Sequence, residues 1–231
     1  MITPALSLGR EYRDALAERP MATIEFYSYG VVLKRNTNGR STEYPIDPGA
    51  LAETIGARYG YASGLLSPHT LFLAQDGPTK LVVEYREPQI TAIWIEGITD
   101  ALQVPLPGLL MLRRTRNGEP DYRLYAVKER PVHLDIPLYA APLPNTGTNG
   151  TCWGSVMRPS PEDLKSNDLS TDWAQFLGSQ FNNHGAANKS ERYPDDIRQL
   201  LINLSKEQAS EYPLHDLQLA GYTLSQAIYG K

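Results

Sequence analysis

Five short segments between residues 71 and 127 are rich in β-branched, aromatic and leucine side chains. They are residues 71–74, 80–86, 91–95, 109–114 and 122–127. Such segments favour β-strands, and Asn117-Gly118 between the last two is a strong signal for a tight hairpin. Strands that follow one another through short connections usually pair as antiparallel neighbours. The chain is therefore expected to contain an antiparallel β-meander, and this expectation constrains its fold more than any other feature.

The C-terminal third predicts helices that cover the meander. Residues 160–163 and 170–173 carry helix-start signals, and an amphipathic helix is expected after Asp196. Residues 214–228 are expected to form a further helix, interrupted near Gly221. A sheet with an apolar face needs such a cover, so the predicted fold class is α+β.

The region before the meander predicts a smaller β-rich element. Residues 22–35 favour a pair of strands, and Asp47 followed by Pro48 predicts the start of a short helix. We expect residues 1–65 to form an N-terminal extension of strands plus this helix. Residues 66–231 are expected to form the main domain, packed with the extension as one unit.

Charge and hydropathy exclude several classes of partner. The chain has 22 Lys and Arg against 26 Asp and Glu, a net charge of -4, so no basic face for nucleic acid is expected. No apolar stretch approaches the roughly 20 residues of a membrane span, and the N-terminus has no apolar run of signal-peptide length. We therefore expect neither a nucleic-acid nor a membrane partner, and a cytoplasmic location.

The single cysteine, Cys152, lies in a short polar loop. A lone cysteine excludes an intramolecular disulfide, and without a second cysteine or a tight histidine cluster there is no template for a structural zinc site. We expect neither a metal nor a cofactor. A thiol that only fills a core gap usually sits inside an apolar periodic segment. Because turn-forming residues surround Cys152 and an expected strand precedes its loop, we interpret it as a candidate nucleophile.

The sequence around this cysteine resembles the active-site stretch of ubiquitin-conjugating enzymes. In residues 130–145 a Pro-rich turn and a strand lead to Pro144-Asn145, and Asn149-Gly150-Thr151-Cys152 follows. Trp94-Ile95-Glu96-Gly97 is similar to that family's second-strand signature. Over residues 70–205 the chain looks most like the D-type prokaryotic branch, which includes protein B of the plasmid-associated PRTRC system. The resemblance implies a ubiquitin-conjugating-enzyme-like fold.

The resemblance also implies acyl transfer through a thioester, without metal or nucleotide in this step. Cys152 would take a ubiquitin-like protein from an activating enzyme and pass it to an amine. Asn145 is the candidate donor to the oxyanion, and His184 the candidate general base for the amine. The implied partners are a ThiF-type activating enzyme, a ubiquitin-like protein and a JAB-type peptidase.

Three positions depart from the pattern of the eukaryotic enzymes. Leu143 stands where they have histidine, the Asn-to-Cys interval is one residue shorter, and Trp153-Gly154 replaces Leu-Asp. In the bacterial branch a histidine after the cysteine offsets the missing one. His184 is the better match for it and His215 is the other.

Two further functions stay open at this point. The chain could be a catalytically inactive relative that serves as a binding or adaptor module in a plasmid-encoded complex. It could also be a Cys-His hydrolase, although no papain-like or caspase-like signature surrounds Cys152. The residues have simpler roles as well: Cys152 as a core filler, Asn145 as a turn former and His184 as part of a mobile loop.

Overall fold

The computed structural model describes residues 22–37, 40–58, 63, 65–76, 78–147, 150–153 and 158–230. These residues fall into two compact units, divided between residues 62 and 63. Asn38-Gly39, a dipeptide that favours a tight turn, lies outside the described residues.

The first unit is a three-stranded antiparallel sheet followed by a helix. Its strands β1 (Ala22–Tyr27), β2 (Gly30–Thr37) and β3 (Arg40–Ile46) lie in sequence order. Only two of these strands were expected. Helix α2 (Pro48–Arg58) begins as predicted, because the Asp47 carboxylate accepts the main-chain N–H groups of Gly49 and Ala50 at 3.3 and 3.2 Å.

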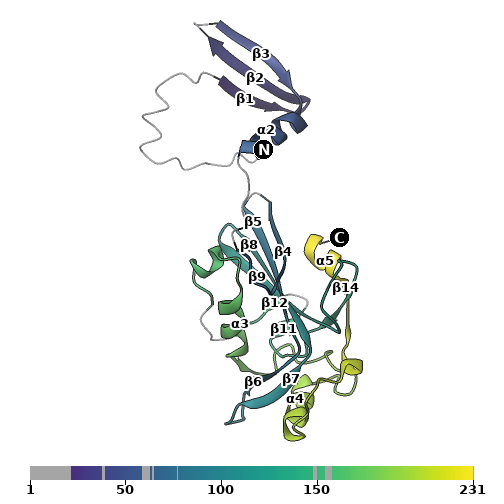
Figure 1. Cartoon of the computed structure of the whole chain (residues 1–231). Coiled ribbons are helices and arrows are strands. Elements are labelled where there is room, and N and C mark those ends of the chain that lie inside the picture. Colours follow the sequence, from purple (N-terminus) through teal and green to yellow (C-terminus); the bar gives the residue numbers. More distant parts are fainter. Residues whose placement is uncertain are drawn as a thin grey trace. The chain divides into compact units, whose positions relative to one another are not determined.

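The second unit is built on a six-stranded antiparallel sheet (Figure 1). The strand order is β14-β10-β9-β8-β5-β4. Asn117 and Gly118 both have positive φ and form the predicted two-residue turn between β8 and β9. The strands are β4 (Thr70–Asp76), β5 (Thr79–Arg86), β8 (Gly108–Arg116), β9 (Glu119–Val127), β10 (Pro137–Ala140) and β14 (Leu219–Thr223).

The expected single meander is interrupted between β5 and β8. Strand β6 (Gln89–Ile95) leaves the main sheet and pairs instead with β7 (Leu102–Leu106) and, in parallel, with β13 (Gln180–Phe181). The second unit is α+β with mostly antiparallel pairing, but residues 91–95 belong to a separate small sheet. Alternation alone could not reveal this, because it does not say which neighbour a strand pairs with.

Short helices complete the second unit. They are the 3₁₀ turns η1 (Asp163–Lys165) and η2 (Leu214–Asp216) and the helices α3 (Ser170–Leu177), α4 (Ile197–Lys206) and α5 (Leu224–Tyr229). The predicted helix over residues 214–228 was wrong, since strand β14 occupies its middle. Gly221, with φ +78°, lies in this strand, and Thr223 then caps α5 through a capping box with Gln226.

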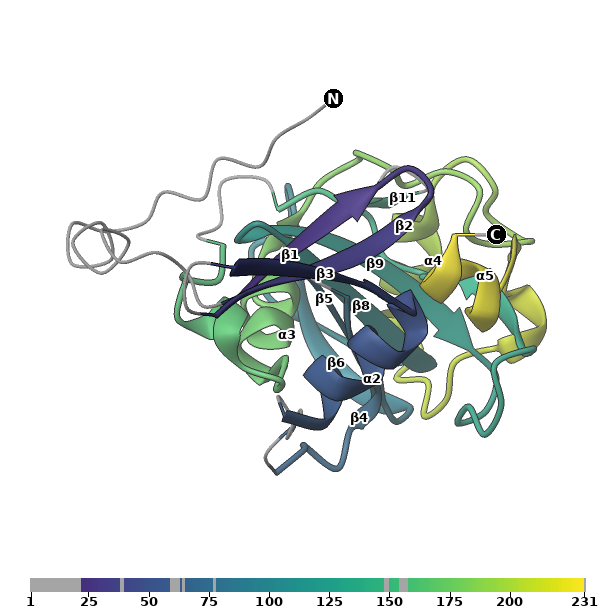
Figure 2. The same cartoon turned by 90° about the horizontal axis from the view of Figure 1, so that it is seen from above.

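The side chains of β5 and β8 alternate between two apolar clusters. One contains Val82 and Met111 and includes buried residues of α3 and α4. The other contains Val83 and Leu110 and includes buried residues of α5. Helices α3 and α5 accordingly lie on opposite sides of these strands (Figure 2). Because both faces are covered, both strands are almost continuously apolar in sequence.

A buried ion pair fixes α3 to the sheet. Arg113 of β8 and Asp172 of α3 are both 0% exposed and lie 3.0 Å apart. The hydroxyl of Tyr122 on β9 donates to the same carboxylate at 2.7 Å. The fold thereby satisfies a charge that would be costly to bury alone.

Candidate active site

Cys152 directly follows a small β-hairpin. Strands β11 (Thr146–Gly147) and β12 (Gly150–Thr151) pair antiparallel, with Thr146 opposite Thr151. One position further, the main-chain N–H of Cys152 donates to the carbonyl of Asn145 at 2.7 Å. The hairpin thus brings Asn145 and Cys152 face to face at its open end, and Cys152 is partly exposed.

The next residue anchors this end of the hairpin in the core. Trp153 is 3% exposed, and its ring meets those of Tyr122 and Phe176 edge-on, with centroids 4.7 and 5.8 Å away. Aromatic pairs with this geometry stabilise a fold beyond the area that they bury. The main chain of Cys152 is therefore held on one side by Asn145 and on the other by Trp153.

Asn145 adopts an unusual backbone conformation. Its φ is +61°, in the left-handed region that asparagine tolerates better than other non-glycine residues. The residue is 3% exposed, and its buried Oδ1 finds no hydrogen-bond partner among the described residues. Buried amide oxygens in folded proteins usually have a partner, so this oxygen departs from the rule.

His184 is joined to Asn145 through the main chain. The N–H of Asn145 donates to the carbonyl of His184 at 2.7 Å, and the N–H of His184 donates to Oδ1 of Asn182 at 2.8 Å. The next residue, Gly185, has φ +59°, and a Cβ there would lie 2.7 Å from the carbonyl oxygen of Thr146. Only glycine permits this close approach of the loop to the hairpin.

The structure therefore gathers the three predicted site residues into one main-chain network, Cys152 to Asn145 to His184. Within the described residues, no side-chain hydrogen bond joins them. The His184 side chain is exposed. The other candidate, His215, lies in η2, and the described hydrogen bonds do not connect it to this network.

Leu143 has a structural role at the position of the eukaryotic histidine. It is 0% exposed and belongs to the same apolar cluster as Trp153. Its carbonyl accepts the hydroxyl of Thr146 at 2.8 Å. An imidazole here would have to be buried among apolar side chains, so the substitution follows from the packing.

The sequence analysis did not identify Lys189, which lies next to the hairpin. It is 4% exposed, and its Nζ donates to Oγ1 of Thr146 at 2.5 Å and to the carbonyl of Ala141 at 3.3 Å. Burial lowers the pKa of this ammonium from 10.5 to about 8. A single lysine in the polar stretch 188–192 carries no sequence signal of burial.

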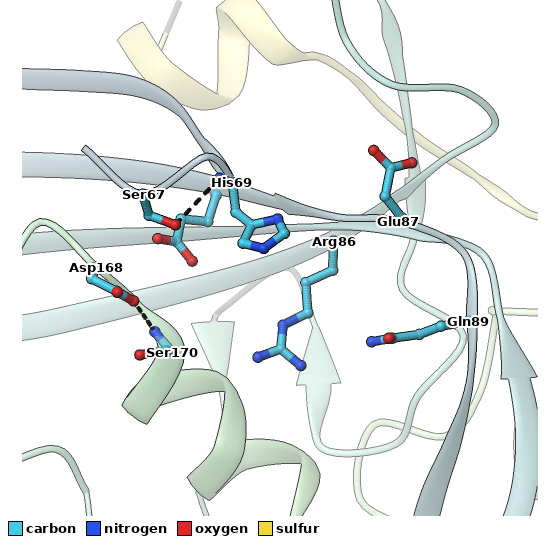
Figure 3. Close-up of a pocket in the computed structure, with 8 residues that line it drawn as sticks. Ser67, His69, Arg86, Glu87, Gln89, Asp168 and Ser170 are labelled. Atoms are coloured by element: carbon cyan, nitrogen blue, oxygen red, sulfur yellow. Dashed lines mark hydrogen bonds between the residues drawn. The ribbon is translucent and has the colours of Figure 1, made fainter. Parts of the chain in front are cut away.

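A second polar site lies away from the hairpin, beside the start of α3 (Figure 3). This pocket has a volume of about 260 Å³, and the Arg86 guanidinium projects into it, 4.9 Å from the centre of the Trp173 ring. The Asp168 carboxylate accepts the main-chain N–H of Ser170, and Glu84, whose pKa burial raises, accepts that of Leu169.

Ser67 and His69 lie side by side in this pocket and share one hydrogen bond. The bond between them runs from the main-chain N–H of His69 to the Ser67 hydroxyl at 3.2 Å and does not involve the imidazole ring (Figure 3). Among the described residues, no group of three or more His, Cys, Asp or Glu side chains is placed to hold a metal ion. No described helix is long and apolar enough to cross a membrane.

The sequence model of one protein family, prokaryotic E2 family D, matches residues 51–220. This span is well over half of the chain and includes Asn145, Cys152 and His184. The chain belongs to prokaryotic E2 family D. Comparisons with curated proteins and with solved structures gave no significant match.

Membership of family D, a prokaryotic group named for E2 or ubiquitin-conjugating enzymes, confirms the resemblance drawn from the sequence at the level of the family. The match is longer than the expected 70–205, because it begins inside α2 and ends inside β14. The hairpin that precedes Cys152 and the loop that contains His184 both lie within it.

Proposed function

We propose that this family D chain accepts a ubiquitin-like protein from a ThiF-type activating enzyme as a thioester on Cys152 and passes it to an amine. The observation that carries the proposal is the main-chain network that holds Asn145 and His184 beside a partly exposed cysteine. Membership of an E2-like family supports the same reaction class.

The reaction consists of two acyl transfers. The Cys152 thiolate attacks the thioester carbonyl, a new C–S bond forms, and the activating enzyme's thiolate leaves. The acceptor amine then attacks the Cys152 thioester, loses a proton to His184, and releases the Cys152 thiolate. In both steps the Asn145 side-chain amide donates to the tetrahedral oxyanion.

The wider setting forms part of the proposal. A JAB-type peptidase would reverse or process the conjugates. This part of the proposal follows the resemblance to the D-type branch, which includes protein B of the plasmid-associated PRTRC system. We assign the reaction to the cytoplasm, because a lone reactive thiol stays reduced there. Neither nucleic acid nor membrane takes part.

A binding module without catalysis is the second candidate. Leu143 is buried where the eukaryotic enzymes have histidine, and among the described residues no side chain hydrogen-bonds to Cys152. An adaptor that keeps the fold but not the chemistry would have the same two features.

A charging assay separates the two candidates. The full chain is incubated with a ThiF-type activating enzyme, its ubiquitin-like protein and ATP, and analysed on non-reducing gels. We expect an adduct that dithiothreitol removes, that is absent in Cys152→Ala and that becomes a dithiothreitol-resistant ester in Cys152→Ser. If no cognate set of proteins yields an adduct on the folded wild-type chain, the conjugating function is wrong and the adaptor remains.

The same assay tests the roles of Asn145 and His184. Asn145→Gly keeps the positive φ but removes the amide, so discharge to free lysine should slow by about a hundredfold or more. His184→Ala should slow discharge to free lysine, whereas His133→Ala, an exposed histidine outside the network, should leave it unchanged. If all three variants discharge at the wild-type rate, neither Asn145 nor His184 takes part in the mechanism.

A further inference from the structure

A pocket of about 340 Å³ lies behind the hairpin that precedes Cys152. Strands β9, β10 and β14 provide one part of its wall, and the hairpin together with the loop 185–189 provides another. Its volume is near the lower end of the range for small-molecule sites, about 300–1,000 Å³. The pocket thus has room for a short segment or a small ligand.

The charge in this pocket is one-sided. Among the described residues that line it, Lys189 carries the only formal charge, and the other titratable side chains are Tyr125 and Tyr222. The pocket beside α3 is different, because three carboxylates line it together with Arg86. Of these two pockets, the one behind the hairpin presents a cation without an acid in its described wall.

Lys189 has no anionic partner among the described residues. An ammonium group carries three donors, and the two acceptors that it reaches, the Ala141 carbonyl and the Thr146 hydroxyl, are both neutral. The other nearly fully buried cation of this unit, Arg113, is paired with Asp172. Buried charges in proteins are usually paired, and Lys189 lacks such a partner among the described residues.

The wall near Lys189 suits a peptide with small side chains. Ala140, Ala141, Ala187, Ala220, Gly147 and Gly185 all contribute to it. Strand β14 is the edge of the six-stranded sheet, and its outer backbone groups are not paired within that sheet. Such an edge can pair with an extended segment, and small wall residues leave space for its main chain.

We propose that this pocket binds the C-terminal carboxylate of an extended peptide with small side chains, with Lys189 as the counter-ion. One end of the ligand meets the ammonium through a charge-assisted hydrogen bond. The main chain of the peptide runs along β14. The site lies next to Thr146 and is separate from the thiol, so it does not depend on the conjugating function.

Nuclear magnetic resonance of the full chain tests the proposal without any partner enzyme. The Cε resonance of Lys189 is followed against pH, alone and with trialanine, trialanine amide, acetate or inorganic phosphate. Trialanine should bind and raise the midpoint of the Lys189 titration by about one pH unit or more, because a carboxylate favours the ammonium form. Trialanine amide, which lacks the carboxylate, should leave the midpoint unchanged.

Two variants separate binding from folding. Lys189→Met should weaken trialanine binding about tenfold or more. Ala220→Leu fills the pocket and keeps the lysine, so it should abolish trialanine binding and leave the free midpoint in place. Equal binding of the amide, or unchanged binding in folded Lys189→Met, would overturn the carboxylate site. If acetate or phosphate binds as tightly as trialanine, the pocket is a general anion site and the proposal of a peptide ligand is wrong.

Discussion

Asn145 lies between the two other candidate residues in the main-chain network, because it binds both Cys152 and His184. Its place after a proline predicted either a turn or an oxyanion donor. The structure gives it a left-handed backbone and a buried, unpaired amide oxygen. No rule of spacing could have predicted that the same residue also holds His184, because that contact depends on the loop before α4.

The lowered pKa of Lys189 has a measurable consequence for stability. The folded pKa is about 8 and the unfolded value 10.5, so between these values the unfolded chain binds more protons. Stability must therefore rise with pH in this range, by about 1.5 kcal/mol from pH 8 to 9.5. Near pH 10, where tyrosines of the unfolded chain titrate, the buried tyrosines oppose the rise, because burial raises the pKa of Tyr122 and Tyr212.

Urea unfolding at several pH values checks this expectation. The rise should be smaller in Lys189→Met than in the wild type, by about the 1.5 kcal/mol that Lys189 contributes. Lys80, whose pKa burial also lowers, remains in both proteins, so the difference between the two curves isolates Lys189. If stability depends on pH in the same way in both proteins, Lys189 does not carry a buried charge with a lowered pKa.

At the scale of elements, local signals predicted strands better than their partners. The strand positions and the Asn117-Gly118 turn followed from side-chain type. The separation of β6 from the main sheet did not, because pairing is decided by packing across the whole unit. Strand β14 was mistaken for a helix since Leu219-Ala220-Gly221 has no strong β preference, and its edge position against β10 decides its form.

The link between β8 and α3 provides a test at this scale. Asp172→Asn leaves the Arg113 charge buried without its partner, and we expect it to lower the free energy of unfolding by about 3–5 kcal/mol. Glu162→Gln removes the exposed pair with Lys165, which is 2.7 Å long, and should leave stability nearly unchanged.

Urea unfolding of the two variants at neutral pH gives the comparison. A similar midpoint for both proteins would mean that the Arg113 guanidinium is satisfied by the carbonyls of Asp163 and Ser166, which it also contacts. In Asp172→Asn the amide oxygen can still accept the hydrogen bond from the Tyr122 hydroxyl. The loss of stability therefore measures mainly the missing negative charge beside Arg113.

At the scale of the whole molecule, the division between residues 62 and 63 predicts independent folding. Both apolar clusters of the second unit lie entirely within residues 63–231. A chain truncated to these residues should therefore unfold cooperatively, with a thermal midpoint within a few degrees of the full-length chain. Asn167 donates to the Ser63 carbonyl at 2.8 Å, so the truncation should not go beyond Ser63.

Tryptophan fluorescence measures this directly. All three tryptophans, Trp94, Trp153 and Trp173, lie in the second unit, so the signal reports on the same residues in both chains. A broad or absent transition in the truncated chain would show that residues before 63 complete its core. Because the family match begins at residue 51, the result shows whether residues 51–62 are needed for the second unit to fold.

The partly exposed cysteine next to the hairpin also makes the chain a ready-made probe. Because no other thiol exists, a maleimide dye or spin label attaches at one defined point without any engineering. Two main-chain hydrogen bonds, through Asn145, connect Cys152 to the loop that contains His184. Cys152 also directly precedes Trp153, which is buried in the core. Changes in its spectrum would therefore follow partner docking and pocket occupancy in real time, in the native sequence.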